Sequence, residues 1–232
     1  MSINNSMGFP HISTGILPLD IATGIGGFPR GRIIEIYGPK AAGKTLIALH
    51  TIAEAQKLGK TCAYIDTENS MNPQLAISIG VKIDDLLYVQ PDSIDQALYK
   101  TEELIKSDQI SVIVVNSVAE RVPQEDLDET VGFNVSFQTQ LISKAIRKFT
   151  GAANQNNTIV IFINRTRETD EIQETTTSGR SLVFYASMRL HVRCEKQIRN
   201  GNKVLGNRIE VTFTKNKVGS PFQTATFDLL FS

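Results

Sequence analysis

Short apolar runs alternate along the chain with longer segments in which apolar residues recur at helical spacing. Five runs are almost continuously apolar, which is typical of strands buried on both faces of a sheet. They span residues 33–37, 61–66, 86–89, 112–115 and 158–163. Because strands that alternate with helices favour a mainly parallel sheet flanked by helices, we expect an α/β fold with right-handed crossovers.

The second half of the chain adds helices and a different strand pattern. Apolar residues recur at helical spacing over 94–105 and 137–149. Beyond Tyr185, residues 188–193 and 208–214 alternate apolar and polar positions around a polar stretch that holds Asn200-Gly201, and 224–231 resembles a further strand. These segments predict antiparallel strands at the C-terminal end of the sheet. The longest segments without periodicity, 122–134 and 165–179, are expected to be functional or mobile loops.

Composition bounds the size and the charge. The 232 residues, 41% of them hydrophobic, suffice for one core, so we expect a polar leader over 1–11 and one domain over 12–232. The 24 Lys and Arg residues balance the 24 Asp and Glu residues. This balance excludes a strongly basic protein that binds nucleic acid through its overall charge, so any polyanion site must be local.

The sequence also disfavours a membrane protein and a disulfide-bonded protein. No apolar stretch approaches the ~20 residues that span a bilayer, and the N-terminal segment lacks a basic region followed by an apolar block. We therefore expect a cytoplasmic protein with no membrane partner. Cys62 and Cys194 each lie in an apolar strand-like run, which predicts buried, reduced thiols rather than a disulfide or a metal site.

One segment has a phosphate-binding pattern. G-x-x-x-x-G-K-[ST] is matched by Gly38-Pro39-Lys40-Ala41-Ala42-Gly43-Lys44-Thr45, directly between a predicted strand and a helical segment, as the pattern requires. Gly38 and Gly43 let backbone amides curl around a β-phosphate, and the helix N-terminus adds partial positive charge. Lys44 is suited to neutralise the β and γ oxygens, and Thr45 offers its hydroxyl to Mg²⁺.

Carboxylates follow the next predicted strand. The segment YIDTE places Asp66 and Glu68 at the carboxyl edge of the sheet, where the phosphate loop also opens. Glu68 is a candidate base toward water. The alternative is that Asp66 or Glu68 caps the helix that begins near Asn72, and Asp66 is the better candidate for that role.

Several segments together resemble one family. The chain closely resembles the bacterial RecA recombinases in ISTGILPLDIATGIGGFPRGRIIEIYGPKAAGKT, GKTCAYIDTEN, SVIVVNSVAE, KAIRKFTG, TIVIFIN, ETTTSGRSLVFYASMRL and TKNKVGSPF. The resemblance runs from about Ile12 to Phe231. It implies a RecA-type P-loop ATPase core that binds ATP and Mg²⁺, assembles head to tail, and binds single-stranded DNA in recombination and repair.

The resemblance also implies roles for individual residues. Lys44 and Thr45 match the phosphate-binding lysine and the Mg²⁺-binding hydroxyl, and Glu68 matches the general base for the attacking water. Lys215 and Lys217 match a pair that reaches the γ-phosphate of ATP held by the neighbouring subunit. From the residues alone, these two lysines would be an exposed strand end.

Two aromatic residues and a set of nucleotide contacts complete the expectations. Phe184 matches an interface aromatic, with a place in the core as the alternative, and Phe231 is a candidate to pack on adenine. The expected nucleotide contacts are Gly38, Pro39, Lys40, Ala41, Ala42, Gly43, Lys44, Thr45, Asn72, Asn116, Lys215, Lys217 and Phe231. The expected catalytic residues are Glu68, Lys44 and Arg165.

Two positions depart from the family where hydrolysis is concerned. Asn116 ends the strand SVIVVN, where the family has an aspartate that holds the water shell of Mg²⁺. An amide keeps the acceptor oxygen and loses the charge, which typically costs ~10–100-fold in affinity or activity, so we expect ATP binding with weakened hydrolysis. Arg165 replaces a glutamine that senses the γ-phosphate. It could pair with that phosphate or partly replace the Mg²⁺ charge, and a solvated loop arginine is the alternative.

The two segments that match the family's DNA-binding loops are acidic. Residues 124–134 contain Glu125, Asp126, Asp128 and Glu129, with Phe133 near the end, and residues 165–179 contain Glu168, Asp170, Glu171 and Glu174. Carboxylates repel phosphates, and the second segment has no ring on which bases could stack. The remaining candidates for phosphate-backbone contacts are Arg147, Arg167, Arg180 and Arg189, with salt-bridged arginines as the alternative. The residues therefore favour nucleotide binding over DNA binding.

The matching segments begin by Ile12 and the chain stops at Ser232, so we expect a short, divergent member limited to the ATPase core, with neither the family's N-terminal oligomerisation helix nor its C-terminal domain. Two hypotheses follow. The first is a minimal RecA-like protein that binds single-stranded DNA as an ATP-dependent oligomer. The second is a degenerate RecA paralogue that binds nucleotide and modulates another RecA filament through protein contacts.

Overall fold

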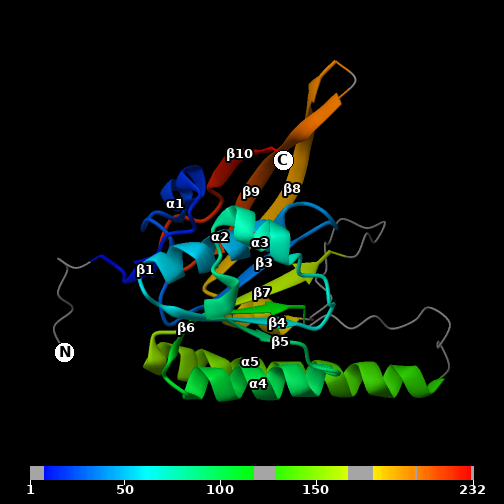
Figure 1. Cartoon of the computed structure of the whole chain (residues 1–232). Coiled ribbons are helices and arrows are strands. Elements are labelled where there is room, and N and C mark those ends of the chain that lie inside the picture. The colour runs from blue at the N-terminus through cyan, green and yellow to red at the C-terminus, as the bar shows by residue number, and fades with distance from the viewer. Residues whose placement is uncertain (1–7, 118–128, 167–179, 202, 231–232) are drawn as a thin grey trace.

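The centre of the protein is an eight-stranded sheet in the order β10-β9-β8-β3-β7-β6-β4-β5 (Figure 1). The computed structural model describes residues 8–117, 129–166, 180–201 and 203–230. The strands of this sheet are β3 (Ile33–Gly38), β4 (Thr61–Asp66), β5 (Leu86–Val89), β6 (Ile110–Asn116), β7 (Ile159–Arg165), β8 (Met188–Asn200), β9 (Lys203–Asn216) and β10 (Thr224–Leu230). A separate two-stranded sheet joins β1 (His11–Ile12) to β2 (Phe28–Pro29).

The strand directions confirm the expected fold class. All pairings from β8 through β3, β7, β6 and β4 to β5 are parallel. The pairings of β9 with β8 and with β10 are antiparallel, so the antiparallel strands lie at the C-terminal end of the sheet. The five predicted buried strands are all present, and their bounds differ from the predicted ones by at most two residues.

Helices cover both faces of the sheet, as Figure 1 shows. They are α1 (Leu17–Thr23), α2 (Lys44–Lys57), α3 (Pro73–Ile79), α4 (Ile94–Lys106), α5 (Glu129–Asn156) and α6 (Arg180–Tyr185), with a 3-10 turn at Ile83–Asp85. Side chains alternate between the two faces along each strand. In β3, Ile34 and Ile36 pack in the cluster with α2, whereas Ile33 packs in the cluster with α4 and α5. No helix in the described ranges is long and apolar enough to cross a membrane.

The parallel strands bring four polar strand ends to one edge of the sheet. Gly38, Asp66, Asn116 and Arg165 are the last residues of β3, β4, β6 and β7. The register pairs Gly38 with Arg165 and Asp66 with Asn116. Because carboxyl ends of parallel strands meet at the same edge, residues more than a hundred positions apart in the chain become neighbours there.

The β8–β9 ribbon corrects one prediction. Both strands are longer than predicted, and their ribbon projects beyond the helices that cover the rest of the sheet (Figure 1). Cys194 lies on this ribbon and is exposed, whereas Cys62 is buried in β4; both thiols are free. The prediction of a buried Cys194 was wrong because no layer of helices covers this part of the strand.

The first predicted loop also needs correction. Residues 129–134 belong to α5, which begins at Glu129. Gly132 and Asn134 are weak helix formers, and they concealed this helical start in the sequence. The acidic positions at 125, 126 and 128 and those of the second segment at 168, 170, 171 and 174 lie outside the described residues.

Candidate nucleotide-binding site

The phosphate loop connects β3 to α2 through residues with unusual backbone angles. Gly38 has φ 150° and Gly43 has φ 95°, and Ala41 between them also has a positive φ of 61°. A Cβ atom at Gly38 would lie 2.1 Å from the carbonyl oxygen of Val192, so only glycine fits there. These angles curl the loop so that α2 begins at Lys44.

Lys44 is a buried cation inside the loop, 7% exposed. Its Nζ donates hydrogen bonds to the carbonyl oxygens of Gly38 at 2.9 Å and Pro39 at 2.6 Å. Burial, with a smaller contribution from the positive charge of Arg165, lowers the pKa of Lys44 to about 8, and Glu68 opposes this shift. A buried ammonium held by neutral carbonyls is poorly compensated, so the loop fits an anionic phosphate group.

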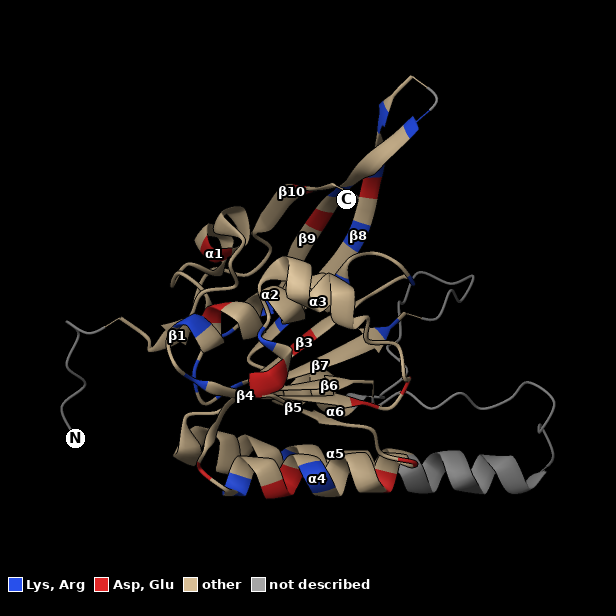
Figure 2. Ribbon diagram, in the orientation of Figure 1, with Lys and Arg blue, Asp and Glu red and all other residues tan. Residues whose placement is uncertain are grey.

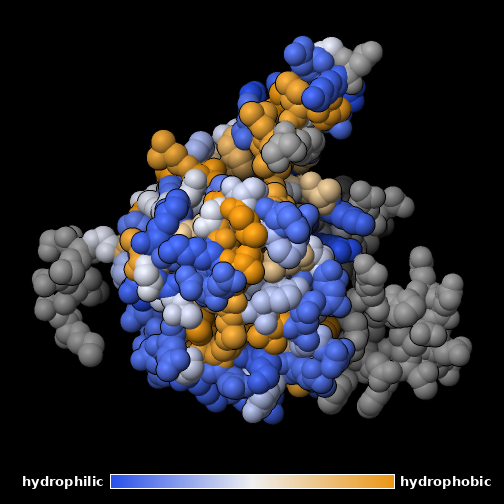
Figure 3. Space-filling view, viewed as in Figure 1, coloured by the Kyte–Doolittle hydropathy of each residue, from blue (hydrophilic) through white to orange (hydrophobic). Residues whose placement is uncertain are grey.

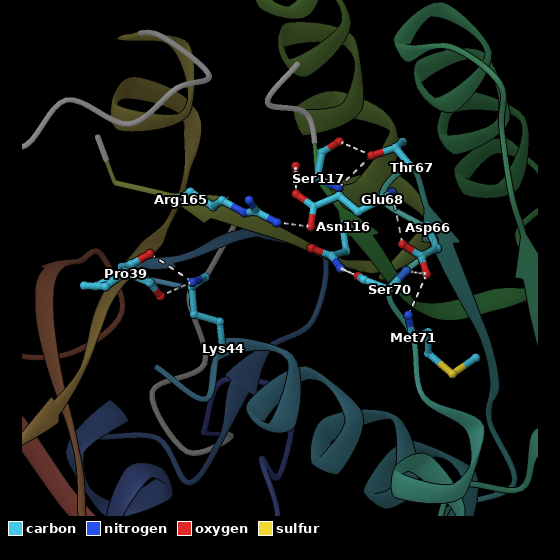
Figure 4. A network of polar contacts seen from close by, with 11 residues as sticks. Pro39, Lys44, Asp66, Thr67, Glu68, Ser70, Met71, Asn116, Ser117 and Arg165 are labelled. Atoms are coloured by element: carbon cyan, nitrogen blue, oxygen red, sulfur yellow. Dashed lines mark hydrogen bonds and ion pairs between the residues drawn. The ribbon is translucent and has the colours of Figure 1, made fainter. Parts of the chain in front are cut away.

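Glu68 lies across the site from Lys44 and has two polar partners. Arg165 Nη2 donates to Glu68 Oε2 at 2.6 Å, and the Ser117 hydroxyl donates to Glu68 Oε1 at 3.0 Å (Figure 4). The Arg165 side chain is 35% exposed and the Glu68 side chain 16%. Arg165 is thus the last residue of β7, and its side chain is paired with the candidate base Glu68. The alternative of an arginine in a solvated loop does not hold.

Asp66 shapes the turn that carries Glu68. It is fully buried, and its carboxylate accepts hydrogen bonds from the backbone amides of Glu68, Ser70 and Met71. The Tyr88 hydroxyl donates to the same carboxylate at 3.0 Å. With its oxygens engaged in this way, Asp66 holds the turn in place and is not suited to bind a metal ion.

Asn72, rather than Asp66, caps α3. Its Oδ1 accepts a hydrogen bond from the amide of Leu75 at 3.1 Å. The capping alternative for Asp66 was therefore wrong in its detail, although Asp66 does organise the turn that leads to the helix. A contact of Asn72 with nucleotide stays a prediction.

Asn116 joins β6 to the same turn. It is 4% exposed, and its amide donates to the Ser70 hydroxyl at 3.0 Å. Among the described residues, no group of three or more His, Cys, Asp and Glu side chains could hold a metal ion. A Mg²⁺ ion at this edge would therefore be bound largely by phosphate oxygens and water.

Lys215 and Phe184 meet away from the phosphate loop. Lys215 Nζ donates to the carbonyl oxygens of Val183 at 2.6 Å and Phe184 at 2.9 Å, at the end of α6. Burial, together with the neighbouring charges of Lys217 and Arg189, lowers the pKa of Lys215 to about 8. The Phe184 side chain is 71% exposed, which excludes the alternative of a core aromatic. A pocket of about 480 Å³ is lined by Thr150, Ser181, Phe184, Tyr185 and Lys217.

These lysines lie at the other edge of the sheet from the phosphate loop. The amide of Lys217 donates to the Ser187 carbonyl, and the amide of Ser187 donates to the carbonyl of Ile33, the first residue of β3. Gly38, five residues later, begins the phosphate loop, so about 16 Å of strand separates the two positions. The structure therefore brings Lys44, Glu68, Asn116 and Arg165 together and leaves Lys215 and Lys217 apart. Phe231 lies outside the described residues.

The sequence analysis did not predict an ion pair between Arg189 and a buried glutamate of β3. Arg189 Nε donates to the fully buried Glu35 at 2.5 Å, and the Asn164 amide donates to Glu35 at 2.7 Å. The guanidinium also lies over the Tyr37 ring, 4.6 Å from its centre. Of the two alternatives given for Arg189, the structure supports the salt-bridged arginine, because this side chain neutralises Glu35. The sequence did contain a signal for it: Glu35 lies inside the apolar run IIEIY, and a charged residue in a buried strand needs a partner.

Known proteins of one family are similar to this chain. The RecA N-terminal domain family matches residues 2–232. The chain belongs to this family. Protein RecA of Clostridium perfringens is 50% identical over 226 residues, which cover 95% of this chain and 64% of the relative. Protein RecA of Levilactobacillus brevis is 46% identical over 233 residues, which cover 98% and 62%.

The relatives are longer proteins than this RecA-family chain. It spans 64% of the length of the Clostridium perfringens protein and 62% of the length of the Levilactobacillus brevis protein. Among solved structures, that of the RadB recombinase superposes with a TM-score of 0.69 at 22% identity, covering 94% of this chain and 95% of that one. At this identity, the likeness shows that the two proteins share a fold.

Proposed function

We propose that this RecA-family chain binds ATP with Mg²⁺ at the phosphate loop and acts in DNA recombination and repair, as an ATP-dependent oligomer on single-stranded DNA. The observation that carries the nucleotide assignment is the buried Lys44 ammonium, held only 2.9 and 2.6 Å from two loop carbonyls inside a curled glycine loop. A phosphate in this loop would supply the negative charge that these carbonyls lack.

Each residue of the site has a role in this proposal. Lys44 neutralises phosphate oxygens, and Thr45 is the ligand of Mg²⁺, which when bound supplies positive charge to the β- and γ-phosphates. Glu68 accepts a proton from the attacking water, and the Asp66 turn and the Ser117 hydroxyl position its carboxylate. Asn116 offers only a neutral oxygen beside this machinery, so we expect slow turnover.

The position of Lys215 and Lys217 supports a head-to-tail oligomer. Lys217 is exposed, next to the exposed Phe184, at the edge of the sheet away from the chain's own phosphate loop. About 16 Å of strand separates this edge from the phosphate loop. In a head-to-tail arrangement, this edge of one copy would face the loop of the next, so that Lys215 and Lys217 complete the neighbour's site.

Binding of single-stranded DNA tests the recombinase proposal. Anisotropy of a labelled oligonucleotide, measured at low salt, is expected to rise with protein in the presence of ATP and to rise much less without it. The Lys44→Ala variant, which lacks the phosphate-binding ammonium, serves as the control and should give the curve without ATP. An affinity that ATP leaves unchanged, or no binding at all, would remove this function.

The uncharged Asn116 beside the candidate base favours a second candidate, namely a nucleotide-binding paralogue that modulates another RecA filament through protein contacts. A pull-down with a full-length RecA filament, together with the strand-exchange activity of that filament, tests it. Absence of both association and effect would exclude this candidate. Because this readout needs no DNA binding by the chain itself, the two candidates are separable.

A further inference from the structure

We propose that the groove between α4 and α5 is a contact between two copies of this chain, in which α4 of each copy lies on α5 of the other. This inference goes beyond the proposed function and does not rest on it, because the groove belongs to the helical layer on one face of the sheet. The phosphate loop lies at the carboxyl edge of the sheet instead.

The first step of the argument is the groove itself. Figure 1 shows α4 and α5 side by side below the sheet. The helices run parallel, because Glu102 contacts Lys148 at 3.5 Å and, nearer their C-terminal ends, the Asn156 amide donates to the Ile105 carbonyl at 2.6 Å. A cavity of about 230 Å³ lies between them. Its lining includes Asp95, Tyr99 and Glu102 of α4 and Lys144, Ala145 and Lys148 of α5.

The second step is the charge of the two sides. The α4 side is acidic, through Asp95 and Glu102, and the α5 side is basic, through Lys144 and Lys148. Glu102 already has partners, namely Lys106 at 2.6 Å and Lys148 at 3.5 Å. Asp95 and Lys144 are exposed, and neither forms an ion pair with a residue that the structure describes. The groove therefore offers a partner a free carboxylate on one side and a free ammonium group on the other.

The third step is the choice between two symmetric arrangements. Two copies that meet through the same face are related by a two-fold axis in the plane of contact. An axis across the helices would place α4 on α4, so that the carboxylates of one copy meet those of the other. An axis along the groove places α4 on α5, so that carboxylates meet ammonium groups twice. Because like charges repel across an interface, the groove favours the second arrangement.

The ion pair of Glu102 with Lys148 shows which residues are level in that arrangement. Parallel helices rise by the same amount per residue, so Tyr99 and Ala145, each three residues before a member of the pair, are level. By the same count, Asp95 lies within one helical turn of Lys144. Tyr99 is 67% exposed, and the small Ala145 leaves room for the Tyr99 ring of the other copy. An aromatic side chain that enters a pocket is a common anchor of protein interfaces.

The size of the face predicts a weak contact. The 13 residues of α4 span about 20 Å, and two adjacent helices are about 20 Å wide, so each copy offers roughly 400 Å². This is about half of what each partner buries in a standard interface. Figure 2 shows acidic and basic residues along α4, and the lower part of Figure 3, where this helix lies, is mainly hydrophilic. We therefore expect a reversible dimer that forms only in concentrated protein and that salt weakens.

Sedimentation equilibrium without nucleotide, from micromolar to submillimolar protein, measures this dimer. Asp95→Lys with Glu102→Lys makes both sides of the groove basic, and Lys144→Glu with Lys148→Glu makes both sides acidic. Each double variant should dimerise at least about tenfold more weakly than the wild type. The quadruple variant exchanges the charges of the two sides, so its dissociation constant should return to within about threefold of the wild-type value.

A second ion pair of α4 provides the matched control. Lys100 and Glu103 lie 2.9 Å apart on the same helix and are not among the residues that line the groove. Lys100→Glu with Glu103→Lys should leave dimerisation unchanged. Circular dichroism and thermal melting confirm that each variant is folded. Because no nucleotide is present, failure of the proposed ATP site would not alter this measurement.

Cross-linking tests the arrangement. The exposed native thiol is removed by Cys194→Ser. In this background, copies with Tyr99→Cys are mixed with copies with Ala145→Cys, and a short thiol cross-linker should join the two kinds of copy to each other. Three results would overturn the proposal: a wild type that stays monomeric at every concentration, a quadruple variant as weak as the double variants, or Tyr99→Cys copies that cross-link to one another rather than to Ala145→Cys copies.

Discussion

Raising the pH from 7 to 9 should weaken ATP binding, because it removes the proton from Lys44. This lysine is 7% exposed, and burial together with the nearby Arg165 lowers its pKa from 10.5 to about 8. An ordinary surface lysine would stay charged throughout this range. The pH dependence therefore tests whether the buried ammonium is the group that binds phosphate.

The magnitude follows from the pKa. With a pKa of about 8, Lys44 is about 90% protonated at pH 7 and about 10% protonated at pH 9. A bound phosphate stabilises the ammonium, so the complex keeps the proton and the free protein must regain it. The apparent affinity should therefore fall about tenfold between pH 7 and pH 9.

Loss of the fold does not explain such a fall. The pKa of Lys44 is lower in the folded chain than in the unfolded chain, so between pH 8 and 10.5 the unfolded chain binds more protons. Under these conditions, the contribution of Lys44 to the free energy of unfolding rises with pH. ATP affinity and stability should thus change in opposite directions.

The assay is a titration with a fluorescent ATP analogue at half-unit pH steps. Lys215→Met is the matched control in dilute protein, where no neighbouring copy completes the site, because the pKa of Lys215 is also lowered to about 8, yet this residue lies away from the chain's own loop. The variant should show the same tenfold fall. Equal affinities at pH 7 and 9 in the wild type, or a pH dependence that disappears in Lys215→Met, would refute the reasoning.

Three further outcomes are expected. Asn116→Asp should raise ATP turnover about tenfold or more by adding a negative charge beside the Mg²⁺ position. A turnover rate that falls in this variant would contradict the proposal that Asn116 slows hydrolysis. Glu35→Gln should lower the free energy of unfolding in urea by about 3 kcal/mol, because Arg189, whose side chain is only 13% exposed, loses its charged partner. Glu210→Gln on the exposed ribbon should cost at most about 1 kcal/mol. Equal costs would argue against a special contribution of the Glu35–Arg189 pair. Lys217→Ala should leave ATP binding by dilute protein intact and reduce ATP-dependent light scattering; unaltered scattering would exclude Lys217 from the interface.

The strands and the phosphate loop were predictable because their signals are local. A buried parallel strand is a continuous apolar run, and the loop is defined by eight adjacent residues between a strand and a helix. From parallel pairing alone, Asp66 and Glu68 could be placed at the edge where the loop opens. The family resemblance then singled out Asn116 and Arg165 as departures at that edge.

The contacts among these residues could not be predicted, because they depend on strand order. The pairing of Arg165 with Glu68 requires β7 and β4 to lie on either side of β6, and 97 residues separate the two in the chain. The exposure of Cys194 has a similar origin, since an apolar strand pattern does not reveal that its ribbon extends past the covering helices. Such properties belong to the assembled sheet rather than to any segment.

Sedimentation velocity with ATP, with and without single-stranded DNA, tests the central claim most directly. We expect the wild type to form larger species with ATP, to form the largest with ATP and DNA together, and to return to small species when ATP is omitted. Lys44→Ala should stay small under every condition. A wild-type protein whose size is the same with and without ATP and DNA would contradict the proposal that ATP binding drives assembly.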